Sequence, residues 1–293
     1  MAKIIVLGVG MVGRAIALDL AKSHAVTATD IDEIALRELG DAGEVETLPL
    51  DVTKKDRLES AIAGHDLVVS AVPGFLGFET LRTIVDGGKN VVDISFFEED
   101  PFTLDEVART NGVTAVVDCG VAPGLGNLVL GRQEQEFDHI SSFTCLVGGL
   151  PQNPKPPWNY VAPYSPSDVI EMYTRPARLV RGGKVVTVPA LTEVEEIEFP
   201  GIGTLEAFNT DGLRTLLRKT SIPDLTEKTL RYPGFCKLIS VFQSAGFFDK
   251  ERDVDGTVIR PREVTEKLLT DQWFQTDEDH DVTVMRLVTE GVR

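Results

Sequence analysis

Residues 3–13 read Lys-Ile-Ile-Val-Leu-Gly-Val-Gly-Met-Val-Gly, a short apolar run followed at once by three glycines. The apolar run predicts a buried strand, and the pattern after it predicts a helix over Val12–Lys22. In such a strand–turn–helix unit Gly8 permits the tight turn, Gly10 lets a ligand approach the backbone, and Gly13 lets the helix pack closely on the strand. The helix start then offers free N–H groups to an anion. Residues 3–13 therefore predict a site for a diphosphate.

Asp30 extends this prediction to a dinucleotide, because it ends the second predicted strand, 20 residues after Gly10. A carboxylate there accepts hydrogen bonds from a ribose 2′-hydroxyl and repels a 2′-phosphate, which favours NAD over NADP. Asp30 or Asp32 can also cap the second predicted helix. Asp51 and Val52 follow the third strand, where adenine would lie, although a plain helix-capping turn explains them equally well. The predicted cofactor-binding residues are Gly8, Gly10, Met11, Val12, Gly13, Asp30, Asp51, Val52, Ala71, Val72 and Pro73.

Short apolar runs alternate with helical stretches through residues 1–122, which is typical of a parallel sheet buried on both faces. The predicted strands are Lys3–Leu7, Ala25–Thr29, Val45–Pro49, Asp66–Ser70, Asn90–Ile94 and Val113–Asp118. Because the carboxyl ends of such strands share one edge, Ala71, Val72 and Pro73 are expected where ligands bind. We predict a Rossmann domain with a doubly wound parallel sheet over 1–122.

The pattern changes after this point, and residues 123–293 predict a mixed α+β domain. Its predicted strands are Ile140–Gly149, Lys184–Val188, Glu193–Phe199, Thr204–Phe208 and Asp281–Val288. Its predicted helices are Leu125–Phe137, Ser167–Tyr173, Asp211–Leu217 and Phe235–Ser244. A proline-rich loop over residues 151–158 separates the first strand from the rest.

The formal net charge of −17 argues against nucleic acid or an anionic membrane as a partner, since both would be repelled. No apolar run approaches the roughly 20 residues of a membrane span, and the N-terminus enters the first strand too early for a signal peptide. The three cysteines, Cys119, Cys145 and Cys236, are too sparse for a disulfide framework or a metal site. We expect a cytoplasmic protein that binds no metal.

Several longer motifs resemble the saccharopine-dehydrogenase-like family, and most closely its L-lysine 6-dehydrogenase branch. In the first domain they are residues 73–78 (PGFLGF), 93–96 (DISF) and 118–124 (DCGVAPG). In the second domain they are residues 148–151 (GGLP), 155–157 (KPP), 173–178 (YTRPAR), 211–214 (DGLR) and 229–234 (TLRYPG). The likeness covers essentially the whole chain.

This resemblance implies NAD-dependent oxidative deamination of the ε-amine of L-lysine. The products would be ammonia, NADH and 2-aminoadipate 6-semialdehyde, which cyclises to piperideine-6-carboxylate. The resemblance also implies that the second domain binds the amino-acid substrate and mediates formation of a homodimer.

The chemistry needs a base for the amine and a cation for the substrate carboxylate. Asp118 and Asp93 end the sixth and fifth predicted strands, so we expect Asp118 to hold or deprotonate the amine, with Asp93 or Ser95 assisting. Capping of turns explains both aspartates equally well. The candidates for substrate binding are Arg175, Arg178, Arg214 and Tyr160, for which a surface position or, for Tyr160, core packing is the alternative.

Two other functions stay open. One is a reductase that joins an amine to a carbonyl, as in saccharopine or carboxynorspermidine formation. Ala122 stands where saccharopine reductases carry an acidic residue, which favours lysine oxidation, whereas Phe235 is shared with those reductases. The other is a dinucleotide-binding regulatory protein without turnover.

Overall fold

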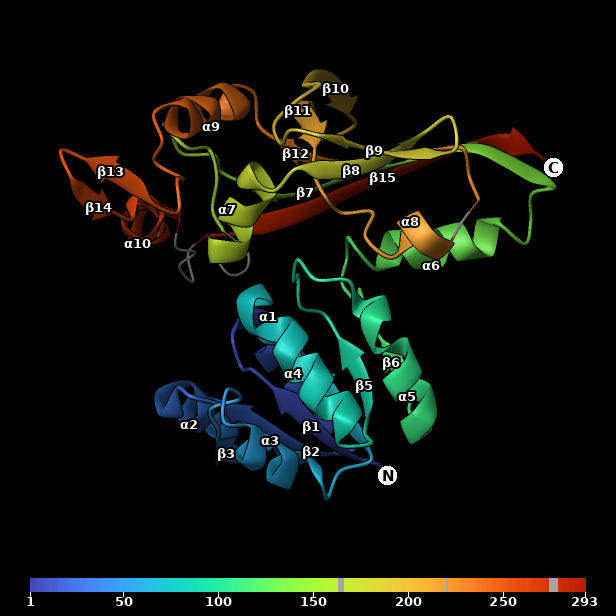
Figure 1. Cartoon of the computed structure of the whole chain (residues 1–293), viewed down its shortest axis with the longest axis vertical. Helices are drawn as coiled ribbons and strands as arrows, with labels where there is room; N and C mark the ends of the chain where they lie inside the picture. Colours follow the sequence, from blue (N-terminus) through green and yellow to red (C-terminus); the bar gives the residue numbers. More distant parts are fainter. Residues whose placement is uncertain (163–165, 220, 274–278) are drawn as a thin grey trace. The chain divides into compact units, whose positions relative to one another are not determined.

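The structure is a computed structural model that describes residues 1–162, 166–219, 221–273 and 279–293. The chain divides into two compact units, Met1–Gly120 and Val121–Arg293 (Figure 1). The boundary expected from the sequence, after residue 122, lies close to this division. Each unit is described by itself below.

Unit 1 is built on a parallel sheet of six strands in the order β3-β2-β1-β4-β5-β6. The strands are β1 (Lys3–Leu7), β2 (Ala25–Asp30), β3 (Glu46–Pro49), β4 (Leu67–Ser70), β5 (Asn90–Asp93) and β6 (Ala115–Val116). The order reverses between β1 and β4, which is the switch point where ligands bind in open α/β sheets. The predicted Rossmann fold is confirmed.

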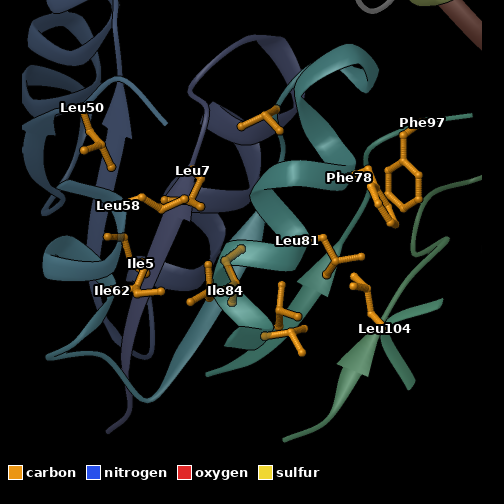
Figure 2. Close-up of a cluster of buried hydrophobic side chains, with 14 residues drawn as sticks. Ile5, Leu7, Leu50, Leu58, Ile62, Phe78, Leu81, Ile84, Phe97 and Leu104 are labelled. Carbon is orange, nitrogen blue, oxygen red and sulfur yellow. The ribbon is translucent and has the colours of Figure 1, made fainter. Parts of the chain in front are cut away.

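Helices cover both faces of this sheet, and β1 shows why its sequence is apolar at every position. The helices are α1 (Met11–Ala21), α2 (Glu33–Ala42), α3 (Lys55–Ile62), α4 (Gly74–Asp86) and α5 (Asp105–Asn111), the last preceded by a 3₁₀ turn (Pro101–Leu104). Ile5 and Leu7 pack with α3 and α4 on one face, as Figure 2 shows, while Ile4 and Val6 pack with α1 and α2 on the other. Each fully buried side chain of this size contributes about 1.5–3 kcal/mol.

The prediction of a long sixth strand is wrong, because only Ala115 and Val116 pair with β5. β6 is an edge strand with one neighbour, and after it the chain turns through Asp118, whose φ is +54°. Asp118 therefore belongs to a loop rather than to the strand.

Within the described residues, unit 2 contains a sheet of seven strands, a hairpin and five helices. Strands β10-β11-β12-β7-β15 follow one another across the sheet, and β8 pairs with both β12 and β9. The bounds are β7 (His139–Pro151), β8 (Ala177–Arg181), β9 (Lys184–Val188), β10 (Glu195–Phe199), β11 (Gly203–Asn209), β12 (Asp224–Arg231) and β15 (Asp281–Val292). β12 and β7 run parallel, and the other pairings are antiparallel. The predicted α+β class is confirmed.

The helices of unit 2 are α6 (Leu125–Gln133), α7 (Pro166–Thr174), α8 (Leu216–Lys219), α9 (Phe235–Ser244) and α10 (Pro261–Trp273). The hairpin joins β13 (Arg252–Val254) and β14 (Thr257–Ile259). The helix predicted over Asp211–Leu217 is wrong, because residues 211–215 form a loop and only α8 follows. The described part of the chain contains no helix of the length and apolarity that crossing a membrane requires.

Candidate functional site

The glycine turn after β1 has the close packing that its sequence predicts. Gly8 has a φ of +93°, and a Cβ atom there would lie 2.6 Å from the carbonyl oxygen of Ala71. A Cβ atom at Gly13 would overlap the carbonyl oxygen of Gly8. These two positions therefore require glycine for the backbone to fold, whatever binds there.

Gly10 is different, because nothing lies within 4 Å of the position its Cβ would take. Gly10 is also the N-cap residue of α1, where no side chain accepts a hydrogen bond from the helix and the first turn contains no acidic residue. Met11 and Val12 follow it with exposed side chains. The free N–H groups at the start of α1 thus face an open space, which fits an anionic diphosphate.

Asp30 lies beside this turn, at the end of β2. Its Oδ2 accepts the N–H of Val9 at 2.8 Å, and its Oδ1 accepts the N–H of Asp32 at 3.0 Å. A carboxylate has about four acceptor positions, so two remain for the hydroxyl groups of a ribose. Asp32, not Asp30, caps α2 by accepting the N–H groups of Ile34 and Ala35.

Asp51 and Val52 follow β3 at the same edge of the sheet. Asp51 Oδ1 accepts both the N–H of Thr53 at 2.9 Å and its hydroxyl at 2.6 Å. The hydrogen bonds from Thr53 lower the pKa of the Asp51 carboxyl below its usual value. The N-cap residue of α3 is Lys54, so Asp51 stabilises the turn before the helix and leaves the helix start without a side-chain cap.

Ala71, Val72 and Pro73 connect β4 to α4. Ala71 donates its N–H to the carbonyl oxygen of Leu7, which continues the pairing of β4 with β1 up to the glycine turn. Pro73 is the N-cap residue of α4. The structure thus places this segment directly against Gly8, at the switch point of the sheet.

Asp93 ends β5 and is fully buried, so it organises the loop that follows. Its Oδ1 accepts the N–H of Ser95 at 2.9 Å, and its Oδ2 lies 3.4 Å from the Ser95 hydroxyl. A Cβ atom at Gly77 would lie only 2.7 Å from Cβ of Ser95, so α4 packs closely on this loop. Asp93 is therefore placed to orient Ser95.

Asp118 lies close to the same loop. The N–H of Cys119 donates to the carbonyl oxygen of Asp93 at 3.1 Å, which ties the turn after β6 to the end of β5. Asp118 is buried and takes a left-handed backbone conformation, which is uncommon for a residue other than glycine. The structure thus brings together the loops that carry all three predicted catalytic residues, Asp93, Ser95 and Asp118.

In unit 2, Arg178 is engaged by a carboxylate of the chain itself. Its Nε and Nη2 donate to the two carboxylate oxygens of Asp211 at 2.9 and 2.7 Å, and its backbone N–H donates to the same carboxylate at 3.0 Å. Arg214 is buried three residues further along this loop, with a φ of +42°. Arg175 lies 3.5 Å from Glu171, one turn earlier on α7.

Tyr160 is buried in an aromatic cluster formed with Tyr173, Phe235 and Trp273. The guanidinium of Arg231 lies 4.4 Å from the centre of the Tyr160 ring and donates from Nε and Nη2 to the Tyr173 hydroxyl. These contacts favour core packing for Tyr160, the alternative that the sequence left open. In the described residues, no group of three or more His, Cys, Asp or Glu side chains is arranged to hold a metal ion.

Two family models match the chain one after the other. The model of the saccharopine dehydrogenase NADP binding domain matches residues 4–116, and the model of the saccharopine dehydrogenase C-terminal domain matches residues 120–292. The chain belongs to the saccharopine dehydrogenase family. Its two models meet close to the division between the two units.

The chain spans 29–62% of the length of the relatives described here. Saccharopine dehydrogenase [NADP(+), L-glutamate-forming] of Pyricularia oryzae is 27% identical over 287 residues, which cover 91% of this chain and 62% of the relative. The mitochondrial alpha-aminoadipic semialdehyde synthase of Rattus norvegicus is 26% identical over 266 residues, 85% of this chain and 29% of the relative. The apo saccharopine dehydrogenase (L-Glu forming) of Saccharomyces cerevisiae superposes with a TM-score of 0.69 at 20% identity, over 85% of this chain and 59% of that one, which shows a shared fold.

This family member also has candidate functional residues that the sequence prediction missed. Ile31 and Ile34 are 74% and 66% exposed beside Asp30, and their signal was two apolar residues placed directly after a predicted strand end. Glu227 is buried on β12, where its Oε2 accepts the Thr210 hydroxyl at 2.5 Å and the N–H of Gly212 at 3.1 Å. No local pattern marks Glu227, because its partners lie on other segments of the chain.

Proposed function

We propose that this chain is an NAD-dependent oxidoreductase that oxidises the carbon bearing the ε-nitrogen of lysine. The observation that carries this proposal is the carboxylate of Asp30 beside an open glycine turn, in a chain of the saccharopine dehydrogenase family. Membership of the family indicates the class of substrate, and the carboxylate of Asp30 favours NAD over NADP as the cofactor.

The residues of unit 1 fit a nicotinamide dinucleotide. A bound dinucleotide supplies the acceptor for a hydride. Gly10 and the start of α1 hold the diphosphate, Asp30 accepts the ribose hydroxyls, and its negative charge disfavours a 2′-phosphate. The exposed side chains of Ile31 and Ile34 offer an apolar surface for adenine.

Proton handling falls to the loops after β5 and β6. The substrate amine must lose a proton before its carbon can be oxidised, and Asp118 is the proposed acceptor. Asp93 acts indirectly, because its buried carboxylate orients Ser95 and its carbonyl oxygen holds Cys119. Hydrolysis of the oxidised carbon–nitrogen bond releases ammonia and 2-aminoadipate 6-semialdehyde.

The carboxylate of the substrate needs a cation, for which Arg175 and Arg214 are the proposed residues in unit 2. Arg178, whose guanidinium binds Asp211, is the third candidate. Tyr160 is buried in the aromatic cluster, so we propose that it supports the packing of unit 2 rather than contacting the substrate.

Saccharopine is the second candidate substrate, because relatives of this chain are named for it and for NADP(+). Oxidation at the same carbon would then release glutamate instead of ammonia. Phe235 favours this alternative and Ala122 favours lysine, as the resemblance of the sequence implies.

The proposal is tested by measuring the absorbance of reduced nicotinamide as it forms. The assay is run with L-lysine or saccharopine as the substrate and with NAD or NADP as the cofactor. We expect turnover of L-lysine with NAD, and release of ammonia in equal amount. Turnover of saccharopine alone would replace lysine by the second candidate. Binding of NAD without turnover of any amine would identify a regulatory protein and contradict the proposal.

The cofactor preference has its own variant. Asp30→Ala is expected to weaken NAD binding about tenfold or more, since hydrogen bonds to a charged group are lost, while NADP binding is spared. Asp32→Ala is the matched control, because it removes the cap of α2 and leaves the ribose contact in place. An unchanged ratio of the NAD and NADP dissociation constants in Asp30→Ala would show that Asp30 does not contact the ribose.

A further inference from the structure

The segment that carries Arg214 leaves the sheet of unit 2 at the end of β11. Strand β11 pairs with β12 up to Asn209, which lies opposite Lys228. The next residue, Thr210, still donates its N–H to the carbonyl oxygen of Glu227 at 3.4 Å. The chain then continues through a loop to α8 (Figure 1). The position of Arg214 therefore depends on the contacts that hold the chain after it leaves β11.

The side chain of Glu227 holds the first part of this loop. Its Oε2 accepts the Thr210 hydroxyl at 2.5 Å and the N–H of Gly212 at 3.1 Å. Glu227 is only 3% exposed, and a Cβ atom at Gly212 would lie 2.5 Å from its Cδ. The Thr210 hydroxyl also lies 2.8 Å from the buried hydroxyl of Thr229. The carboxyl group thus packs directly against the backbone of the turn and fixes residues 210–212 on β12.

Two further contacts hold the same loop. The guanidinium of Arg178 on β8 binds both carboxylate oxygens of Asp211. Leu213 is buried in a hydrophobic cluster that contains Leu225 of β12. The residues that precede Arg214 are therefore fixed by β8 and β12 together.

Arg214 itself has a backbone conformation that arginine rarely adopts. Its φ is +42° and its side chain is buried. The N–H of Leu217 donates to the carbonyl oxygen of Arg214 at 3.2 Å, which closes a tight turn before α8. Such a conformation persists where the surrounding contacts impose it, and it is concentrated at ligand-binding and catalytic sites. The direction in which the Arg214 side chain leaves the backbone thus depends on the contacts of the preceding residues.

We propose that Glu227 is a positioning residue for Arg214. Its carboxyl group fixes the turn formed by residues 210–212, and this turn presents the Arg214 guanidinium to the substrate carboxylate in a set orientation. An arginine that is already ordered loses less conformational entropy when it binds a carboxylate. The inference rests on the carboxylate contact of Arg214 in the proposed function, and it gives a role to a residue that does not itself contact the substrate.

Binding of L-lysine and of cadaverine, which is lysine without its α-carboxylate, tests the proposal. Both are titrated by calorimetry into the full chain in the presence of NADH, because the reduced cofactor cannot accept a hydride. The ratio of the two dissociation constants measures the contribution of the carboxylate. A change that only loosens the fold weakens both ligands alike and leaves this ratio unchanged.

Glu227→Met removes both hydrogen bonds at a similar side-chain size, and it should lower the preference for lysine about tenfold. Thr210→Val removes one of them and should lower the preference about threefold, and it decides the question if Glu227→Met does not fold. Glu227→Gln should keep the preference, because glutamine retains an oxygen that accepts from Thr210 and Gly212. Burial also raises the pKa of Glu227 to about 8, so that a neutral side chain resembles the native group at pH 7.

Glu206→Met is the matched control. Glu206 lies on β11 and likewise accepts two backbone N–H groups, those of Gly234 at 2.8 Å and Cys236 at 3.0 Å. Its loss should lower the melting temperature and leave the preference for lysine over cadaverine unchanged.

Arg214→Ala shows whether the two residues act together. It should lower the preference about thirtyfold or more, and the addition of Glu227→Met should lower it no further. A wild type without this preference, or a preference that survives in Arg214→Ala, contradicts the carboxylate contact of the proposed function and overturns the role of Glu227 with it. A preference that is lost in Arg214→Ala but kept in both Glu227→Met and Thr210→Val overturns the role of Glu227 alone.

Discussion

The two units use their charged residues in opposite ways. In unit 1, Asp30 and Asp93 end strands of one sheet and Asp51 follows a third strand, and each accepts the backbone N–H of the residue two positions later. In unit 2, Arg178 and Glu227 instead bond across long stretches of sequence, Arg178 to Asp211 and Glu227 to Thr210. Glu227 of unit 2 is fully enclosed, whereas the edge residues of unit 1 surround an open glycine turn.

This difference in bonding partners determines which functional residues can be predicted from local sequence. A carboxylate that bonds to its own turn needs only its own segment to be placed, and the parallel sheet brings such turns to one edge. A carboxylate that bonds to a distant strand is placed by the whole fold. Substitutions at Gly13, Glu227 and Arg178 test this contrast.

Gly13→Ala should disrupt the packing of α1 against the glycine turn of unit 1. The added methyl group overlaps the carbonyl oxygen of Gly8, a backbone atom that cannot move without displacing the turn after β1. We expect a loss of roughly 3 kcal/mol or more in the free energy of unfolding, with loss of dinucleotide binding. Thermal unfolding and a titration with NAD measure the two effects.

Gly10→Ala is the matched control, because its Cβ atom meets nothing within 4 Å. Its stability should stay within about 1 kcal/mol of the wild type, while NAD binding weakens because the methyl group occupies the approach to the backbone. If Gly13→Ala retained both stability and binding, the close packing at Gly8 would not be required for function.

The same contrast explains which parts of the fold and of the site can be predicted from the sequence alone. The glycine turn, the aspartates at strand ends and the Rossmann fold follow from local rules, and the structure has them where the sequence predicts. Strand β12 was missed, because six of the eight residues in its sequence Asp-Leu-Thr-Glu-Lys-Thr-Leu-Arg are polar, yet most of the strand is buried. Its polar side chains are satisfied only by residues that folding brings from other segments, such as Thr210 for Glu227.

Errors in the second unit have the same origin. The helix predicted over Asp211–Leu217 is a loop, because Arg178 and Glu227 bind the Asp211–Gly212 turn from two sides. The choice between core packing and substrate contact for Tyr160 also depended on the partners that surround it. The residues adjacent to Tyr160 and Asp211 in the sequence do not indicate which distant residues will contact them.

Glu227 gives the second prediction, a stability that depends on pH. Burial raises the pKa of Glu227 to about 8, against the hydrogen bonds from Thr210 and Gly212, which favour the charged form. Because the folded pKa lies above the unfolded value of 4.5, the stabilising contribution is complete below pH 4.5 and is lost as the pH rises through 8. One pKa unit corresponds to about 1.4 kcal/mol, so the difference between about 8 and 4.5 sets an upper limit of about 5 kcal/mol on the stability that is lost.

Glu227→Gln removes this titration and stays neutral at every pH. The melting temperature of the wild type should therefore fall more steeply between pH 5 and 8 than that of the variant. Parallel curves for the two proteins would show that Glu227 is charged in the folded state and that the buried network of unit 2 is organised differently.

Arg178 gives the third prediction and decides between a structural and a substrate-binding role. Arg178→Ala leaves the buried carboxylate of Asp211 without its guanidinium partner, and because that guanidinium is partly exposed we expect a loss of only about 1–2 kcal/mol. Arg181→Ala is the control, because Arg181 lies on the same strand in an exposed ion pair with Glu193, and its loss should cost less than about 0.5 kcal/mol. A lower melting temperature with unchanged KM for lysine supports the structural role. A raised KM at unchanged melting temperature would instead indicate that Arg178 contacts the substrate. Charged residues of unit 2 would then bind a ligand directly, as is proposed for those of unit 1.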